Sequence, residues 1–208
     1  MLTLHEYTPS QNCWKVRVLL GLLGIPYRTQ PVAIFAGESR TPEFLALNPA
    51  GATPALVLED GRVIAESNAI LCYLAEGTRF MPTDRFARAK VMQWLFFEQY
   101  YVEPVIGSLR FWSLTGRLDL NKDLVPGKRD AAMRALSALE RTLRASLFLG
   151  GTDFTIADIA NYAYAHLAAD CGFPLPGFPS IARWVDRIGG ILGSGYPVVP
   201  YGPEAQPQ

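Results

Sequence analysis

The chain has 208 residues, of which 50% are hydrophobic and 18% are charged, a balance typical of a globular, water-soluble protein. Its 19 basic and 19 acidic side chains cancel, so the composition gives no reason to expect a nucleic acid or an acidic membrane surface as a partner. A net charge of zero also gives weak electrostatic repulsion between copies of the chain, which is compatible with self-association.

The first 80 residues alternate short strand-like and helix-like segments. The apolar residues between Val16 and Leu23 recur at the spacing of one face of a helix. Pro31 indicates a strand that lies at the edge of a sheet or ends there. Asp60-Gly61 predicts a two-residue hairpin turn. The expected strands are 2–7, 27–34, 55–60 and 62–67, and the later expected helices are 41–49 and 67–77.

From residue 85 onward almost every segment has the pattern of a helix. Pro82, between charged residues, indicates a short linker at about 81–85. Pro104 lies inside the longest expected helix and should kink or divide it. The expected helices are 86–112, 128–146, 155–172 and 179–192. The sequence therefore predicts two domains, a small α/β domain at 1–80 and an all-helical domain at 86–208.

The cysteines and histidines indicate a cytosolic protein without a metal site. Cys13, Cys72 and Cys171 lie far apart and form no CxxC motif, which argues against a disulfide framework and for a reducing compartment. The 2 histidines are too few and too isolated for a His-rich metal site. The N-terminus has no signal-peptide pattern, and the most apolar run is far shorter than the ~20 residues of a membrane span.

Four stretches, in order along the chain, carry a resemblance to a known family. They are "SQNCWKVRVLLGLLGIPY" from Ser10, "RTPEFLALNPAGATPALV" from Arg40, "ESNAILCYLAE" from Glu66 and "FTIADIANYAY" from Phe154. Together they resemble the glutathione transferase superfamily over nearly the whole chain. The resemblance implies a thioredoxin-like N-terminal domain, an all-α C-terminal helical bundle, glutathione as co-substrate and a homodimer.

Ser10 is the first candidate catalytic residue. A helix N-terminus carries about half a positive charge and free N–H groups, so it favours an anion. A thiol with a pKa of roughly 8.5 is mostly un-ionised at neutral pH, and a hydroxyl that donates to the sulfur would stabilise the thiolate. From spacing alone, Ser10 or Asn12 could equally well only cap the helix. The resemblance favours catalysis, because Ser10 aligns with the catalytic serine of the zeta and theta classes.

Asn12 and Cys13 are further catalytic candidates. Zeta enzymes carry a Ser-Ser-Cys run here that maleylacetoacetate isomerisation uses, and the second serine and the cysteine of that run are missing. This departure counts against the isomerase. Cys13, one place later, could form a mixed disulfide with glutathione as beta-class enzymes suggest, or it could be a buried packing residue. Asn12 could donate its amide to the sulfur, as similar residues do in nu-class disulfide reductases.

The resemblance also implies the residues that bind glutathione. Thr53-Pro54 matches the family's cis-proline, where the main chain of Thr53 would pair with the cysteinyl part of the tripeptide. Glu66 could accept from the γ-glutamyl ammonium, and Ser67, as a helix N-cap, could hold the neighbouring carboxylate. Arg40 is a candidate partner for the glycine carboxylate, with an ordinary solvated charge as the alternative.

Two stretches of the predicted helical domain are expected to have different roles, one in helix capping and one in packing and ligand binding. Thr155 and Asp158 form a capping box, with a hydrophobic staple from Phe154 to Ile159, and this motif is assigned no chemistry. The segment 91–112 is dense in aromatic residues, most of which should pack in the core or in a dimer interface. Three residues of this segment, Phe97, Tyr101 and Arg110, are expected to line an apolar pocket for the electrophile.

The sequence thus predicts a cytosolic, homodimeric glutathione transferase that joins the glutathione thiolate to small apolar electrophiles, without a metal. Two alternatives stay open. One is glutathione-dependent disulfide or peroxide reduction that uses Asn12 or Cys13. The other is a non-catalytic glutathione-binding module, because a fold does not fix a function.

Overall fold

A computed structural model describes residues 1–207, and the chain divides into two compact units. The first unit contains residues 1–76 together with Tyr196–Pro200, and the second contains the remainder. The sequence-based division instead ended the first domain at residue 80 and placed all of 86–208 in the second. The segment after α8 joins the first unit because Trp14 Nε1 donates to the Tyr196 carbonyl at 3.0 Å and the Tyr196 ring lies against Gly21.

The first unit is built on a four-stranded mixed sheet with the order β2-β1-β3-β4. β1 runs parallel to β2 and antiparallel to β3, so that Leu4 lies opposite both Thr29 and Leu56. The elements are β1 (Leu2–Glu6), α1 (Gln11–Leu22), β2 (Tyr27–Pro31), 3₁₀ turns at Ile34–Ala36 and Glu38–Arg40, α2 (Pro42–Leu47), β3 (Ala55–Val57), β4 (Val63–Ala65) and α3 (Ser67–Ala75). Pro31 is the last residue of an edge strand, which confirms its predicted place.

The hairpin between β3 and β4 differs in detail from the prediction. The Leu58 N–H donates to the Arg62 carbonyl at 2.8 Å, so the loop has three residues, Glu59 to Gly61. Gly61 has a φ of +85°, the left-handed conformation that closes a three-residue hairpin loop after a type I turn. The predicted two-residue turn is therefore wrong, although the hairpin itself is confirmed.

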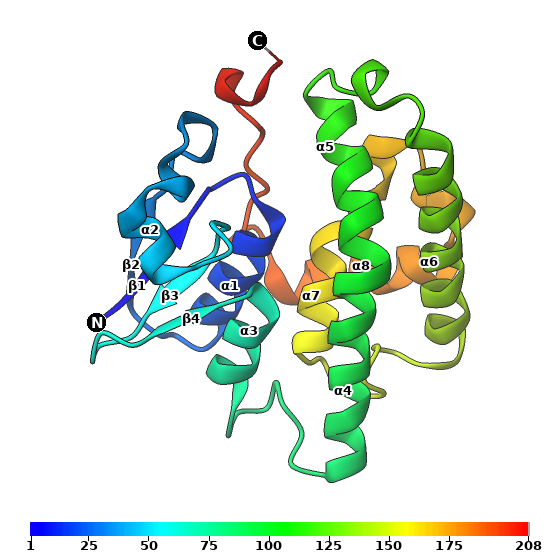
Figure 1. Cartoon of the computed structure of the whole chain (residues 1–208). Helices are drawn as coiled ribbons and strands as arrows, with labels where there is room; N and C mark the ends of the chain where they lie inside the picture. Colours follow the sequence, from blue (N-terminus) through cyan, green and yellow to red (C-terminus); the bar gives the residue numbers. More distant parts are fainter. Residues whose placement is uncertain (208) are drawn as a thin grey trace. The chain divides into compact units, whose positions relative to one another are not determined.

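The core of the first unit lies between the sheet and two helices. α1 and α3 pack against each other beside the strands, as Figure 1 shows. The largest fully buried side chains here are apolar with one exception, and they are Leu4, Lys15, Leu19, Leu20, Leu56, Ile70 and Leu71. Full burial of each aliphatic side chain contributes about 1.5–3 kcal/mol, so this packing fixes where the N-termini of α1 and α3 lie.

The second unit is helical. Its elements are α4 (Arg85–Phe97), a π-helical segment (Glu98–Gly107), α5 (Ser108–Leu114), α6 (Val125–Ala145), α7 (Ile156–Ala165), α8 (Pro179–Leu192) and 3₁₀ turns at Asp119–Asn121, Ala168–Cys171, Leu175–Gly177 and Pro203–Ala205. The helix expected at 155–172 ends at Ala165 and is followed by the 3₁₀ turn at Ala168–Cys171. Trp184, Ile106 and Leu136 are among the fully buried side chains of this unit.

Pro104 divides the long helix as predicted, in the form of the π-helical segment. Proline has no N–H to donate to the preceding turn, and wider helical turns are a known way to absorb such a defect. The Pro104 carbonyl accepts from Lys128 Nζ at 2.6 Å and from the Ser108 hydroxyl at 2.7 Å. Lys128 thereby ties the irregular segment to α6.

The predicted capping box of α7 is confirmed. The Asp158 carboxylate accepts from the Thr155 N–H at 3.0 Å, and it also accepts from the Leu149 N–H at 2.9 Å and from Trp184 Nε1 at 3.0 Å. Phe154 packs against the rings of other aromatic residues. Asp158 therefore links α7 to the preceding loop and to α8, which is a structural role.

Candidate functional site

Ser10 forms the N-terminal cap of α1, directly after the turn that leaves β1. Its hydroxyl oxygen accepts from the Cys13 N–H at 3.4 Å, and its own N–H donates to the Tyr7 carbonyl at 2.9 Å. A hydroxyl group that accepts one hydrogen bond can still donate its proton to another atom. The capping role and the proposed contact with a thiolate are therefore compatible, at a helix end where the first N–H groups have no acceptor inside the helix.

Asn12 meets two other side chains of the first unit. Its side-chain oxygen accepts from Lys15 Nζ at 2.7 Å and from the Ser67 hydroxyl at 3.2 Å. Lys15 Nζ also donates to the Ser67 hydroxyl oxygen at 3.4 Å. These bonds join the beginning of α1 to the beginning of α3. They bring together Asn12, which was predicted to contact the sulfur of glutathione, and Ser67, which was predicted to hold the γ-glutamyl carboxylate.

Lys15 is 0% exposed, and it was not among the residues predicted for the site. Lysine is rarely fully buried unless it has partners, and here the partners of Lys15 include Asn12 and Ser67. The sequence holds a clue to it. Lys15 is the one charged residue in the otherwise apolar run from Cys13 to Val16, and it lies three residues, just under one helical turn, after Asn12.

Cys13 is fully buried at the base of the same helix end. Burial raises the pKa of its thiol, and hydrogen bonds from the Thr53 and Ser10 side chains oppose that shift only in part. A thiol with a raised pKa is a poor nucleophile. The structure thus favours the packing role of Cys13, and it places the Thr53 and Ser10 side chains each beside the Cys13 thiol.

Glu66 and Thr53 have special backbone geometry. The Thr53-Pro54 peptide bond is cis, as the resemblance implies. Glu66 has a φ of 68°, a left-handed conformation that is uncommon outside glycine and that gathers at functional sites. Glu66 also stands at the N-cap of α3, and Ser67 is the first helical residue. The predicted N-cap role of Ser67 is therefore wrong, because its hydroxyl bonds to Asn12 and Lys15 instead.

Arg40 lies on the exposed surface of the first unit. Its guanidinium donates to the Ala50 carbonyl at 2.9 Å and packs on Gly51, in the loop that leads toward Thr53.

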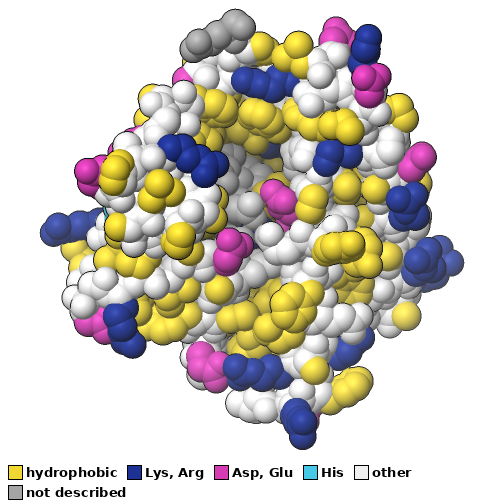
Figure 2. All heavy atoms as spheres, in the orientation of Figure 1, with side chains coloured by type: hydrophobic (Ala, Val, Ile, Leu, Met, Phe, Trp, Pro, Cys, Tyr) yellow, Lys and Arg dark blue, Asp and Glu magenta, His cyan; other side chains and the backbone are white. Residues whose placement is uncertain are grey.

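Two of the three residues predicted for an electrophile pocket lie together in the second unit. Phe97 and Tyr101 have ring centroids 5.1 Å apart. They line an open, mostly apolar hollow of about 700 Å³, together with Gln93, Phe96, Gln99 and Tyr100. In Figure 2, hydrophobic side chains come to the surface along the helices of this unit.

Arg110 does not line that hollow. It is buried on α5, its Nε donates to the Asp170 carboxylate at 2.8 Å, and its guanidinium lies 5.7 Å from the centre of the Tyr201 ring. The prediction that Arg110 joins Phe97 and Tyr101 is wrong, because α5 turns this side chain toward the 3₁₀ turn at Ala168–Cys171. Arg110 and Asp170 are 60 residues apart, and a sequence pattern gives no sign of that pairing.

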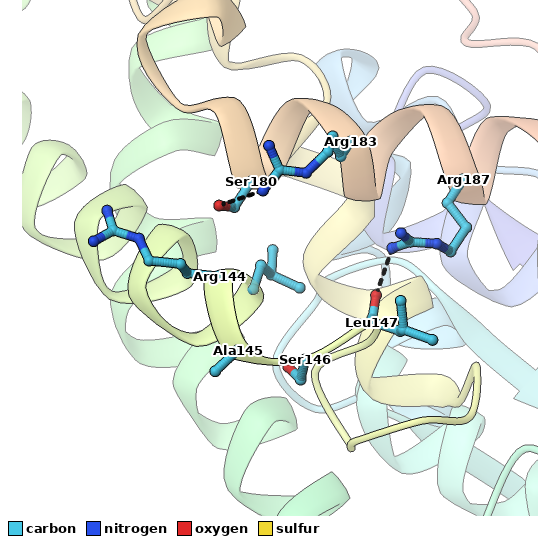
Figure 3. Close-up of a pocket in the computed structure, with 8 residues that line it drawn as sticks. Arg144, Ala145, Ser146, Leu147, Ser180, Arg183 and Arg187 are labelled. Atoms are coloured by element: carbon cyan, nitrogen blue, oxygen red, sulfur yellow. Dashed lines mark hydrogen bonds between the residues drawn. The ribbon is translucent and has the colours of Figure 1, made fainter.

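A second, smaller hollow of about 270 Å³ lies between the end of α6 and α8. Arg183 donates to the Ser180 hydroxyl at 3.1 Å, and Arg187 donates to the Leu147 carbonyl at 2.8 Å. Arg144 extends away from both of them (Figure 3). The residues of this hollow include none of the predicted site residues, and the guanidinium groups of Arg183 and Arg187 hold the start of α8 and the loop after α6.

Within residues 1–207, no group of three His, Cys, Asp or Glu side chains is arranged to hold a metal ion. Over the same residues, no helix has both the length and the apolar character that a membrane crossing requires. The candidate site is the cluster at the start of α1, which brings together hydroxyl, amide and ammonium groups.

Residues 9–76 match the family described as "Glutathione S-transferase, N-terminal domain", and residues 122–187 match the corresponding C-terminal domain. Glutathione S-transferase 3 of Zea mays is 33% identical, over 90% of this chain and 88% of that protein.

A crystal structure of a possible glutathione S-transferase from Rhodopseudomonas palustris is 41% identical with a TM-score of 0.89, over 98% of this chain and 91% of the other. The Escherichia coli disulfide-bond oxidoreductase YfcG is 28% identical, over 88% of this chain and 87% of that protein. These matches confirm the predicted fold, a thioredoxin-like domain followed by a helical domain. The chain belongs to the glutathione S-transferase family.

Proposed function

We propose that the protein binds glutathione as a thiolate at the N-terminus of α1 and transfers it to small apolar electrophiles. The observation that carries this proposal is the convergence of Ser10, Asn12, Thr53 and Ser67 from three separate segments of the first unit. The Ser10 hydroxyl and the first N–H groups of α1 would stabilise the negative sulfur. A lowering of the thiol pKa by one unit corresponds to about 1.4 kcal/mol, which one charge-assisted hydrogen bond can supply.

The remaining parts of glutathione would bind at neighbouring positions. The exposed Glu66 carboxylate would accept from the γ-glutamyl ammonium, and the first N–H groups of α3 would hold the γ-glutamyl carboxylate. The main chain of Thr53, beside the cis-Pro54, would pair with the cysteinyl residue. Arg40 is the proposed partner for the glycine carboxylate, because its guanidinium is exposed on the same unit.

The reaction needs no general base once the thiolate has formed. The sulfur lone pair attacks an electrophilic carbon, a C–S bond forms, and the leaving group departs with its electron pair. Phe97 and Tyr101 remain the proposed contacts for an apolar electrophile, and Arg110 is withdrawn from that role because it is buried against Asp170.

Reduction of a glutathione mixed disulfide is the second candidate function. Two observations favour it. The Asn12 amide nitrogen has no hydrogen-bond partner among residues 1–207, so it is available to donate to a sulfur leaving group. YfcG, a similar protein, is named as a disulfide-bond oxidoreductase. A route through Cys13 is disfavoured by the burial and raised pKa of its thiol.

A homodimer in a reducing compartment is proposed as the working form. Phe96 is 68% exposed and Tyr100 is 74% exposed, and large exposed aromatic side chains that lie together commonly mark an interaction surface. Cys13, Cys72 and Cys171 are all free thiols, which is compatible with the cytosol.

Three measurements test the proposal. Calorimetry with glutathione should show binding, and its absence would leave only a non-catalytic module on the same fold. Assays with a chlorinated nitrobenzene and with a mixed glutathione disulfide then separate conjugation from reduction. Binding without turnover in either assay would contradict both enzymatic functions.

A further inference from the structure

The ammonium group of Lys15 is buried between the two helix ends of the candidate site. Lys15 is 0% exposed, and its Nζ donates to the Asn12 oxygen at 2.7 Å and to the Ser67 hydroxyl oxygen at 3.4 Å. The Ser67 hydroxyl in turn donates its proton to the same Asn12 oxygen at 3.2 Å. The Lys15 ammonium and the Ser67 hydroxyl therefore both donate to the side-chain oxygen of Asn12.

This arrangement determines which way the Asn12 amide faces. An ammonium group has three N–H donors and cannot accept a hydrogen bond. If the amide were rotated by half a turn, its NH₂ group would face the Lys15 ammonium, donor against donor. The oxygen of Asn12 therefore points toward Lys15, and its NH₂ group points the opposite way, where residues 1–207 provide it with no partner.

We infer that Lys15 is a positioning residue, which holds the Asn12 amide in the orientation that donates a hydrogen bond to the sulfur of glutathione. The inference rests on the proposed function, because it needs a sulfur at the N-terminus of α1. In this arrangement Ser10 and Asn12 both donate to the thiolate, and Lys15 acts through Asn12 without touching the sulfur. The same ammonium also holds the Ser67 hydroxyl, so the first turns of α1 and α3 are fixed together.

The test replaces Lys15 by methionine, which has a similar length and suits a buried site. In Lys15→Met the Asn12 amide keeps only the Ser67 hydroxyl as a neighbour on this side, and because a hydroxyl can either donate or accept, the amide can adopt both orientations and part of its donation to the sulfur is lost. We expect the apparent pKa of bound glutathione, measured from thiolate absorbance, to rise by about one unit, and kcat/KM below that pKa to fall about tenfold. The pKa in the pH profile of kcat/KM should move with it. A purely structural role would lower the melting temperature and leave this pKa unchanged.

A double-mutant cycle separates action through Asn12 from a direct effect of the lysine charge on the sulfur. If Lys15 acts through Asn12, Lys15→Met should shift the thiol pKa in the parent and have no further effect in an Asn12→Ala background. An equal shift in both backgrounds would overturn the inference in favour of a direct charge effect. An unchanged pKa in the single variant would overturn it as well.

Two further variants complete the experiment. Lys90 on α4 donates to the Gln93 side-chain oxygen at 2.7 Å, so Lys90→Met removes a similar lysine–amide pair in the second unit and should leave the thiol pKa unchanged. Asn12→Asp keeps an acceptor for Lys15 but has no donor, so it should raise the thiol pKa even if Lys15→Met fails to fold. A parent protein that does not bind glutathione would reject the proposed function itself, whereas normal binding with unchanged pKa values rejects only the role of Lys15.

Discussion

Asn12 and Ser67 lie 55 residues apart in the sequence and are joined by a hydrogen bond of 3.2 Å. Asn12 is in the first turn of α1, and Ser67 is the first residue of α3. The contact therefore brings two helix N-termini, each with free N–H groups, into one region of the first unit. A ligand with two negative groups, a thiolate and a carboxylate, is suited to such a region.

Substitution of Ser10 by alanine tests the thiolate donor. Loss of one preorganised donor to a developing or resting anion reduces kcat by about 10²-fold in other enzymes, and we expect a decrease of that order in conjugation here. The variant should also lose about 1 kcal/mol of stability, because Ser10 caps α1. Steady-state kinetics and urea unfolding measure the two effects.

Thr41→Ala is the matched control for Ser10. Thr41 caps α2 through a hydrogen bond from the Phe44 N–H at 3.3 Å, so its loss should lower stability by a similar amount and leave conjugation unchanged. An unchanged rate in Ser10→Ala would transfer the role to Asn12.

Substitution of Cys13 by alanine tests the packing role of this residue. Because the thiol is fully buried and its pKa is raised, we expect both conjugation and mixed-disulfide reduction to stay within about threefold of the parent. The free energy of unfolding should fall by about 1 kcal/mol, the scale of a small buried group. A selective loss of disulfide reduction would instead show that the Cys13 sulfur takes part in catalysis.

Asp158 and His166 should make opposite contributions to the pH dependence of stability. Burial raises the pKa of Asp158 from 3.8 to about 6, although four hydrogen bonds favour its ionised form. Between about pH 4 and 6 the folded protein holds a proton that the unfolded chain has released, so this group lowers stability as pH rises, by up to ~3 kcal/mol. Burial lowers the pKa of His166 from 6.5 to about 4, so stability from this group rises with pH over nearly the same range.

Two variants separate these contributions. Relative to the parent, the free energy of unfolding of Asp158→Asn should increase between pH 4 and 6, and that of His166→Gln should decrease. Urea unfolding at constant ionic strength measures both. Parallel curves for the parent and both variants would contradict the assigned directions.

The aromatic residues that line the hollow of the second unit should have two different roles, one in dimer formation and one in binding of the electrophile. Phe96 and Tyr100 are the more exposed residues, so Phe96→Ser with Tyr100→Ser should shift the sedimentation coefficient from that of a dimer to that of a monomer. Phe97→Ala should instead raise KM for the apolar electrophile about tenfold, because one buried aromatic contact is lost on binding, and leave glutathione binding intact. An unchanged KM in Phe97→Ala would show that the electrophile binds at another surface.

Much of the candidate site could be predicted from the sequence, because the relevant signals are local. Ser10 caps α1 because a short hydroxyl side chain at that position reaches the N–H three residues on. The capping box of Thr155 and Asp158 depends on the same short reach. The turn at Asp60-Gly61 shows the limit of such signals. A glycine in the left-handed conformation occurs in both two-residue and three-residue hairpin loops, and only the pairing of the two strands selects the three-residue loop found here.

The sequence alone indicated the type and order of most helices and strands, since periodicity along one element is a local property, and through its motifs it indicated the family. The tertiary structure decided which elements meet. It alone placed Lys15 between Asn12 and Ser67, turned Arg110 toward Asp170, and returned Tyr196 to Trp14 across 182 residues. The physical reason is that a buried polar group needs a partner, and for partners far apart along the chain that choice is made only when the packed helices bring donor and acceptor within reach.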